Sequence, residues 1–179
     1  MQGHVGGGCG RESGGELMPR LTPTQAGGGN RCAFLDMIAW SEIGATLLAE
    51  SDDGYNVLVG STPAAPLLFH SYDRHPDIYN QRLNSTAAGR YQILARWWEP
   101  YQRLLRLPDF SPQSQDFVAL QQIRERGALP LIDAGRFSQA VALCANLWAS
   151  LPGNDYGQHQ QQISALQAAY QRAGGALTA

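Results

Sequence analysis

The chain has 179 residues, 44% of them hydrophobic, and its 13 basic and 15 acidic side chains leave a formal net charge of −2. This length and composition predict one folded domain with a sizeable core. The near-neutral charge gives no general reason to expect nucleic acid or an anionic membrane as a partner. No apolar run approaches a membrane span, and the N-terminus lacks the pattern of a signal peptide, so we expect no stable membrane association.

Cysteine and histidine positions argue against a metal or redox site. Cys9, Cys32 and Cys144 form no CxxC pair and have no histidine at metal-ligand spacing, and their odd number argues against a disulfide scaffold. A free thiol in a helical pattern is typically a small buried hydrophobe. His70 and His75 flank an aspartate without a third ligand nearby, which favours loop or surface roles. We therefore expect no metal site.

The N-terminal part of the chain is rich in glycine. Residues 1–30 carry almost no apolar periodicity, which predicts a disordered or loosely attached extension before a folded domain over 31–179. Met18 is an alternative start. Asn30 fits the N-cap of a first helix, the helical pattern runs from there to about position 42, and Gly44 lies where that helix is expected to stop.

A β-rich segment follows the first helix. The runs 55–59 and 67–69 favour strands, and a turn rich in Gly, Ser, Thr and Pro separates them. A third strand around 84–86 would extend this hairpin into a small sheet. The sequence thus predicts an α+β fold, mainly helical, with a small antiparallel β-sheet inserted after the first helix.

Helical patterns account for the remaining chain. We expect helices over about 89–98, from Pro100 onward, from the Ser111-Pro112 start to Arg126, and within 137–151 and 158–175.

Glu42 is the first candidate functional residue. Helical spacing aligns it with Phe34, Leu35 and Ile38, so its carboxylate continues an apolar stripe. Desolvation and the negative end of the helix dipole both favour the neutral acid, so we expect a raised pKa. A glutamate protonated near neutral pH is a proton donor. The alternative is a solvated or arginine-paired residue at a helix end, which is the commoner situation for glutamate.

A second group of candidates lies in STAAGRYQILARWW, residues 85–98. Gly89 permits close approach of the backbone. Tyr91 and Gln92 offer a phenol and an amide that suit hydrogen bonds to a sugar or its N-acetyl group. The two tryptophans that end the stretch fit core packing in a helix.

Several stretches together resemble the lambda-type bacteriophage endolysins. They are AFLDMIAWSE, GYNVLVG, STAAGRYQILARWW, DFSPQSQD, VALQQIRERGALP and NLWASLPG followed by YGQ, which occur in the same order and with similar spacings over about residues 31–175. The resemblance implies a lysozyme-like fold and a lytic transglycosylase, whose chemistry needs neither a metal nor an organic cofactor. Such an enzyme cleaves the β-1,4 bond between N-acetylmuramic acid and N-acetylglucosamine of peptidoglycan and leaves a 1,6-anhydromuramic end.

The same resemblance implies roles for individual residues. Glu42, in WSE, would be the catalytic acid and base. Tyr91 and Gln92, in GRYQ, would lie at the sugar-binding cleft, and Ser150 and Tyr156 would supply polar contacts from its second lip. The chain departs from the family directly after the glutamate, which is generally followed by Gly-Thr and a polar stretch. Here Ile43 intervenes, and GATLLAESDDG follows, which is more apolar at its start.

The resemblance also implies a cellular setting. The partner would be the glycan strands of peptidoglycan, and we expect a monomer. The protein would accumulate in the host cytoplasm until a holin releases it, and would then act on periplasmic peptidoglycan to lyse the host cell.

Three other functions remain open at the level of sequence. A hydrolytic muramidase needs a second carboxylate, which Asp52, Asp53 or the less favourably placed Asp36 would supply. The Asp52-Asp53-Gly54 stretch is also an ordinary turn signature. A non-catalytic wall-binding module would use Glu42 structurally. A nucleic-acid binder is the weakest of the three, because the arginines between 82 and 136 are interspersed with acidic residues.

Overall fold

Eight helices form the regular structure of the part of the chain that the computed structural model describes, residues 21–155, 157 and 159–178. Their bounds are α1 Pro23–Ala26, α2 Gly29–Ile43, α3 Ala45–Ala49, α4 Ala95–Leu105, α5 Pro112–Glu125, α6 Leu129–Asp133, α7 Phe137–Cys144 and α8 Ile163–Arg172. In this part of the chain no helix is long and apolar enough to cross a bilayer.

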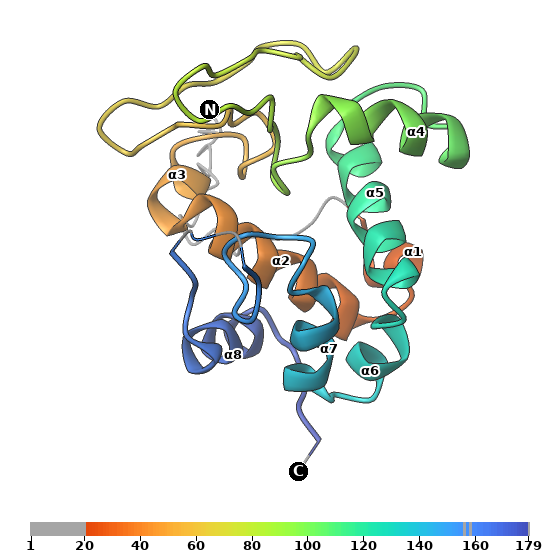
Figure 1. The fold of residues 1–179 in the computed structure, drawn as a ribbon. Coiled ribbons are helices and arrows are strands. Elements are labelled where there is room, and N and C mark those ends of the chain that lie inside the picture. Colours follow the sequence, from red (N-terminus) through yellow and green to blue (C-terminus); the bar gives the residue numbers. More distant parts are fainter. Residues whose placement is uncertain (1–20, 156, 158, 179) are drawn as a thin grey trace, which may run out of the picture.

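Helix α2 runs through the middle of the molecule, as Figure 1 shows. It contacts α1, α3, α5, α6 and α8. A helix surrounded in this way is apolar on most sides, and the residues of α2 that are buried are Cys32, Ala33, Phe34, Leu35, Asp36, Met37, Ile38, Ala39, Ser41 and Ile43. The last turn of α2 leads toward α3 and the segment that precedes α4, which positions Glu42 at the end of the core helix.

The ends of α2 differ in how well the sequence predicts them. Gly44 ends the helix as expected, with φ of 83° and its N–H bonded to the Trp40 carbonyl. The N-cap is Gly28 and not Asn30. The Asn30 side chain instead donates to the Ile132 carbonyl at 3.0 Å and accepts from the Ala176 N–H at 2.9 Å, so tertiary contacts use the groups that an N-cap would need.

The folded domain begins earlier than position 31. Leu21 is 1% exposed, and its N–H donates to the Asp116 carboxylate in α5 at 3.0 Å. Helix α1 follows, with Thr22 and Gln25 forming a capping box. The expectation of a loosely attached extension is therefore wrong for residues 21–30. Residues 1–20, and with them Met18 and Cys9, lie outside the described part.

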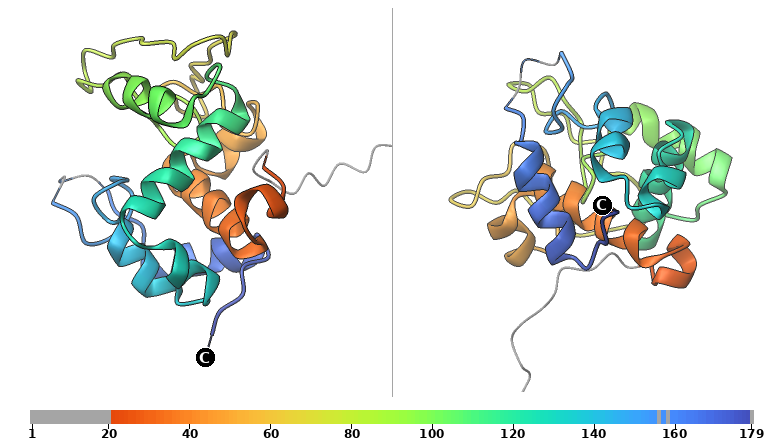
Figure 2. Two further views of the ribbon diagram at one scale, coloured as in Figure 1. Left: turned by 90° about the vertical axis from the view of Figure 1, so that its right-hand side faces the viewer. Right: turned by 90° about the horizontal axis from the view of Figure 1, so that it is seen from below.

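The expected β-sheet is present only as isolated antiparallel bridges between single residues. Among the described residues these bridges pair Val57 with Leu68, Leu58 with Ala88, Thr62 with Ala65, Asn80 with Ser85, and Ala88 with Ile93. The predicted pairing of 55–59 with 67–69 is thus found, but no continuous ladder forms. Gly54 and Gly60 have positive φ angles on either side of the first run, and Pro66 has no N–H to donate before the second. Figure 2 shows the segment between α3 and α4 as a long loop layer at the end of the molecule opposite the C-terminus.

The prediction of a helix over 89–98 is wrong for its first half. Residues 88–93 form a tight turn closed by two hydrogen bonds between the backbones of Ala88 and Ile93, and α4 starts only at Ala95. Helix α4 also continues through Pro100, which was expected to start a new helix. The carbonyl that loses its partner belongs to Arg96, which is exposed, so water can satisfy it.

The later helices follow the sequence more closely. Helix α5 has Ser111 at its N-cap and ends before Gly127, as predicted. Helices α7 and α8 are shorter than the segments 137–151 and 158–175 in which they were predicted. Cys32 and Cys144 are free and buried, as expected.

Candidate functional site

Glu42 lies one residue before the end of α2 and is partly exposed, between two buried neighbours. Its Oε1 atom accepts two hydrogen bonds from Ser150, one from the hydroxyl at 2.5 Å and one from the backbone N–H at 3.3 Å. These two residues are 108 positions apart in the chain. The structure thus brings together the candidate acid and one of the predicted contacts of the second lip.

The pKa of Glu42 is raised above its ordinary value, as the sequence predicts. Burial is the dominant cause, and the two hydrogen bonds from Ser150 partly oppose it because they stabilise the charged form. Among the described residues no charged side chain contributes to this shift. A carboxyl group in this setting keeps its proton to a higher pH than a solvated glutamate and remains accessible to a ligand.

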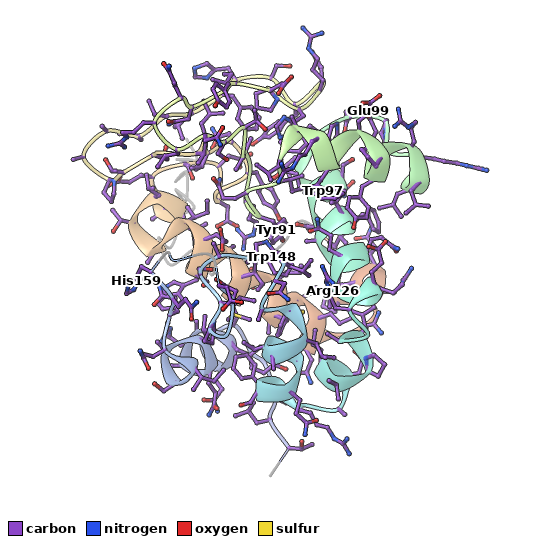
Figure 3. The ribbon with its side chains drawn as sticks, in the orientation of Figure 1. Tyr91, Trp97, Glu99, Arg126, Trp148 and His159 are labelled. Carbon is purple, nitrogen blue, oxygen red and sulfur yellow. The ribbon has the colours of Figure 1, made fainter. Side chains whose placement is uncertain are left out.

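Ser150 belongs to a segment after α7 that side-chain amides hold in place. The Asn154 amide donates to the backbone carbonyls of Trp148, Ala149 and Leu151, and the Gln160 amide donates to the Asn154 carbonyl at 2.7 Å. The Trp148 indole N–H in turn donates to the Tyr91 carbonyl at 3.1 Å, and Figure 3 shows these two residues close together near the middle of the molecule. The segment that carries Ser150 is therefore fixed to the turn that carries Tyr91 and Gln92. Of the predicted contacts, Tyr156 lies outside the described residues.

Gln92 lies in the tight turn with a left-handed backbone, φ 47°. Its amide nitrogen donates to the Gly89 carbonyl at 2.9 Å and more weakly to the Val57 carbonyl at 3.4 Å. Within the described residues its amide oxygen accepts no hydrogen bond, and the side chain is partly exposed. The oxygen is thus available to a donor on a ligand.

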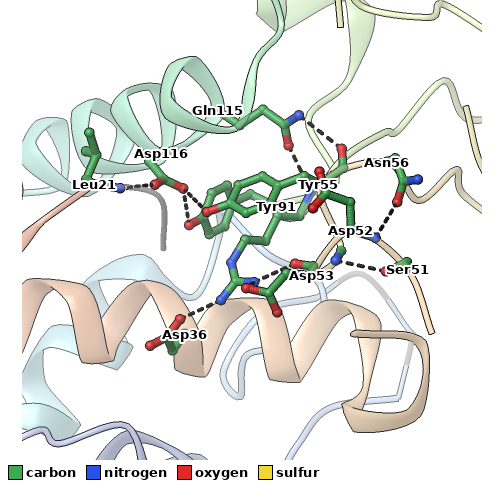
Figure 4. Close-up of polar contacts among 12 residues, drawn as sticks. Leu21, Asp36, Ser51, Asp52, Asp53, Tyr55, Asn56, Tyr91, Gln115 and Asp116 are labelled. Atoms are coloured by element: carbon green, nitrogen blue, oxygen red, sulfur yellow. Dashed lines mark hydrogen bonds and ion pairs between the residues drawn. The ribbon is translucent and has the colours of Figure 1, made fainter. Parts of the chain in front are cut away.

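The Tyr91 hydroxyl does not face solvent. Tyr91 is 1% exposed and its hydroxyl donates to Asp116 Oδ1 at 2.7 Å, an atom that also accepts from the Tyr55 hydroxyl at 2.8 Å. Figure 4 shows the two phenol rings next to each other with both hydroxyls directed at Asp116. Burial and the nearby carboxylate hold the pKa of Tyr91 well above its ordinary value. This geometry contradicts the expected direct contact between the Tyr91 hydroxyl and a sugar, and gives the residue a supporting position instead.

Arg90 is a component of this region that the sequence analysis did not single out. It is completely buried, and its guanidinium pairs with Asp36 of α2 at 2.5 Å and with Asp53 at 2.8 Å. Nothing in the sequence distinguishes Arg90 from the other arginines, because its partners are 54 and 37 positions away.

Each carboxylate considered as a second catalytic group has a partner inside the protein. Asp36 and Asp53 pair with Arg90, and Asp52 accepts from the Tyr72 hydroxyl at 2.7 Å. Asp36 is also 5% exposed, which keeps it from any ligand at the surface. These contacts leave Glu42 as the candidate acid.

The sequence predicts loop or surface roles for His70 and His75 in place of metal binding. His70 is exposed, in line with the expectation, but His75 is 6% exposed. Its Nε2 lies 2.8 Å from the Ile93 carbonyl and its Nδ1 accepts from the Asp77 N–H, so the ring holds the turn in place as a neutral imidazole. No group of three or more potential ligands occurs within the described residues.

Two hollows lie elsewhere on the described surface. One is lined by Phe69, Ser71, Asp73, Arg74 and Pro76, and the other lies around the start of α7. Neither includes Glu42, so the candidate site is defined by its polar contacts.

Comparison with known proteins gives consistent matches. The sequence model of the Endolysin family matches residues 32–177. The endolysin of Escherichia phage lambda is 50% identical over 151 residues, covering 82% of this chain and 92% of the relative. The endolysin of Escherichia phage P2 is 46% identical over 154 residues, with coverages of 82% and 93%.

A solved structure agrees with these matches. Bacteriophage lambda lysozyme, determined in complex with a chitohexasaccharide, superposes with a TM-score of 0.75 and 49% identity over 84% of this chain and 97% of the lysozyme chain. The lysozyme-like fold is thereby established, and the resemblance inferred from the sequence is confirmed. The chain belongs to the Endolysin family.

Proposed function

We propose that this endolysin cleaves the glycan strands of peptidoglycan as a lytic transglycosylase, with Glu42 as its single acid and base. The bond broken is the β-1,4 bond between N-acetylmuramic acid and N-acetylglucosamine. The product carries a 1,6-anhydromuramic end, and loss of the glycan strands lyses the host cell.

The reaction needs one carboxyl group and no water. Protonated Glu42 donates its proton to the glycosidic oxygen as the bond from that oxygen to C1 of the muramic acid breaks. The C6 hydroxyl oxygen of the same sugar then bonds to C1, and the Glu42 carboxylate accepts the hydroxyl proton. Glu42 is protonated again at the end of the cycle, so atoms and charge balance.

The observation that carries this proposal is the engagement of every other candidate carboxylate. A retaining or inverting glycoside hydrolase uses a second Asp or Glu as nucleophile or base. Asp36 and Asp53 neutralise the buried Arg90, and Asp52 accepts from Tyr72. Each of these three carboxylates is therefore held by a contact of the fold, and Asp36 is also buried away from the surface.

The substrate assignment rests on the site and on the relative. Lambda lysozyme has been solved with a chitohexasaccharide, a linear amino-sugar chain. Gln92 is partly exposed and has a free amide oxygen, which suits an N-acetyl N–H or a sugar hydroxyl. We assign Ser150 and Tyr156 to the opposite lip. Tyr91 has a supporting role and does not contact the sugar, because its carbonyl accepts from the Trp148 indole and its hydroxyl donates to Asp116.

The cellular setting is part of the same proposal. The protein would act as a monomer that accumulates in the host cytoplasm, leaves through a holin-dependent pore and acts on periplasmic peptidoglycan. No metal or organic cofactor takes part in the scheme.

Mass spectrometry of fragments released from purified sacculi tests the proposal. The unmodified protein should release anhydromuramic ends, which are one water lighter than hydrolysed ends. Glu42→Gln should fold normally and lose activity by about 100-fold or more, because an amide cannot donate and recover the proton. Glu50→Gln, the same change at an exposed position, should leave activity unchanged.

The alternatives give different results. Reducing ends would mean that water attacks, and Asp52 and Asp53 would then be examined as the second carboxylate. Binding of sacculi without release of fragments by the unmodified protein would instead indicate a wall-binding module.

A further inference from the structure

A short chain of hydroxyl groups leads from the core to the candidate acid. Ser41 lies in α2, directly before Glu42, and is 8% exposed. Its hydroxyl donates to the Ser150 hydroxyl oxygen at 2.6 Å, and the Ser150 hydroxyl donates to Glu42 Oε1 at 2.5 Å. The chain thus joins two adjacent residues of α2 through a residue from the segment after α7.

The direction of hydrogen-bond donation along this chain follows from the number of protons that each group carries. Each serine hydroxyl can donate one hydrogen bond, and its oxygen can accept others at the same time. While Ser41 donates to the Ser150 oxygen, the proton of Ser150 is directed at Glu42 Oε1. The Ser150 backbone N–H, which can only donate, also points to Oε1 at 3.3 Å. Oε1 therefore receives two donors and is held as an acceptor.

We propose that Ser41 is a positioning residue of the reaction, which acts through Ser150 to keep Glu42 Oε1 as an acceptor and so places the transferable proton on Oε2. This inference rests on the proposed function of Glu42 and extends it to a residue that touches no substrate. In the protonated acid, Oε1 is the carbonyl oxygen and Oε2 carries the proton toward the glycosidic oxygen. In the carboxylate, Oε2 recovers the proton from the sugar hydroxyl.

The same geometry predicts how Ser41 affects titration. Hydrogen bonds in series strengthen one another, so donation from Ser41 makes Ser150 a stronger donor to the carboxylate. Such donation favours the charged form and limits how far burial raises the pKa of Glu42. Removing Ser41 should raise that pKa further. Because the protonated acid is the active form, the alkaline limb of the pH–rate profile should move to higher pH.

The test compares pH–rate profiles for release of fragments from purified sacculi by four proteins: the unmodified chain, Ser41→Ala, Ser150→Ala and Ser164→Ala. Ser41→Ala should move the alkaline limb upward by about half a pH unit and lower the maximal rate several-fold. Ser150→Ala should shift the limb in the same direction and by more. Ser164→Ala, the same change at an exposed position of α8, should alter neither quantity.

A double variant separates positioning from a general loss of structure. Because Ser41 acts through Ser150, Ser41→Ala combined with Ser150→Ala should behave like Ser150→Ala alone. A limb that stays in place in Ser41→Ala, or effects of the two changes that add, would overturn the inference. Anhydromuramic products from all variants would leave the proposed function intact in either case. Reducing ends from the unmodified protein would refute the function itself.

Discussion

Gly89 occupies a position where only the absence of a side chain permits the observed packing. Its φ angle is 79°, and a Cβ atom there would lie 2.1 Å from the Gln115 amide oxygen. Gln115 is completely buried, and its amide bonds the Arg90 N–H and the carbonyls of Tyr55 and Phe110. The end of this side chain therefore cannot move aside without breaking hydrogen bonds that fix the candidate site.

Gly89→Ala should consequently destabilise the protein by about 2–4 kcal/mol, from backbone strain together with lost buried hydrogen bonds. Gly174→Ala is a matched control, because its φ angle is 86° but nothing lies within 4 Å of its Cβ position. Gly174→Ala should lower the free energy of unfolding only by the backbone strain, about 1–2 kcal/mol. Urea denaturation measures both free energies of unfolding. Equal costs for the two variants would show that Gln115 does not restrict position 89.

Glu42 and Tyr91 show what the sequence predicts of single residues and what it misses. Glu42 was placed correctly because a helical stripe and a following glycine determine its surroundings locally. The orientation of the Tyr91 side chain depends on Asp116, which is 25 positions away in α5. Arg90 was missed for the same reason. Local patterns indicate which residue types suit a sugar-binding site, but long-range partners decide which of them reach it.

Asp116 joins α5 to three other parts of the chain and illustrates how the elements are connected. Its Oδ1 accepts from the hydroxyls of Tyr55 and Tyr91, and its Oδ2 accepts from the Leu21 N–H. These donors come from the loop after α3, from the tight turn before α4 and from the start of the fold. Since Asp116 is completely buried, none of the three donors can turn to water if the carboxylate is lost.

Asp116→Asn should therefore destabilise the protein by about 1–3 kcal/mol at pH 8, because an amide replaces one acceptor oxygen with an N–H₂ group that faces a donor. Chemical denaturation checks this value. Asp73→Asn, at an exposed position, should change stability by less than about 0.5 kcal/mol. A neutral effect of Asp116→Asn would mean that the three donors find other acceptors.

The helices and the loop layer differ in how far local signals determine them. Gly44 after α2, Ser111-Pro112 before α5 and Gly127 after it are local signals, and the structure has helix boundaries at each. The segment 53–93 has strand-like runs, but glycines and prolines limit their pairing to single bridges. The left-handed Gln92 within it donates locally to the Gly89 carbonyl and, across 35 positions, to the Val57 carbonyl. The sequence gives no local sign of the second contact.

At the scale of the whole molecule, one buried charge cluster joins the core helix to the loop layer. Arg90 carries one positive charge, whereas Asp36 and Asp53 carry two negative charges when both are ionised. Burial is the main reason why the pKa of Asp36 is raised to about 7, although Arg90 lowers it and Asp53 and Asp116 raise it further. Near neutral pH the cluster therefore gains or loses a proton in the folded state.

This titration predicts how stability depends on pH. An unfolded aspartate has a pKa near 4, so between about pH 4 and pH 7 folded Asp36 binds a proton that the unfolded chain does not. The stability that Asp36 contributes is complete below pH 4 and is lost as the pH rises through 7. The difference corresponds to at most about 4 kcal/mol.

Asp36→Asn isolates this contribution, because an amide resembles the protonated acid in shape but does not titrate. Glu42 and Asp116 also have raised pKa values and His75 a lowered one, so the pH dependence of the unmodified protein is a sum over several groups. The difference in unfolding free energy between the two proteins removes the contributions that they share. We expect the unmodified protein to lose stability relative to Asp36→Asn between pH 4.5 and pH 8, as measured by urea denaturation at both values. A difference that stays constant would mean that Asp36 remains ionised throughout, and that Arg90 compensates for its burial.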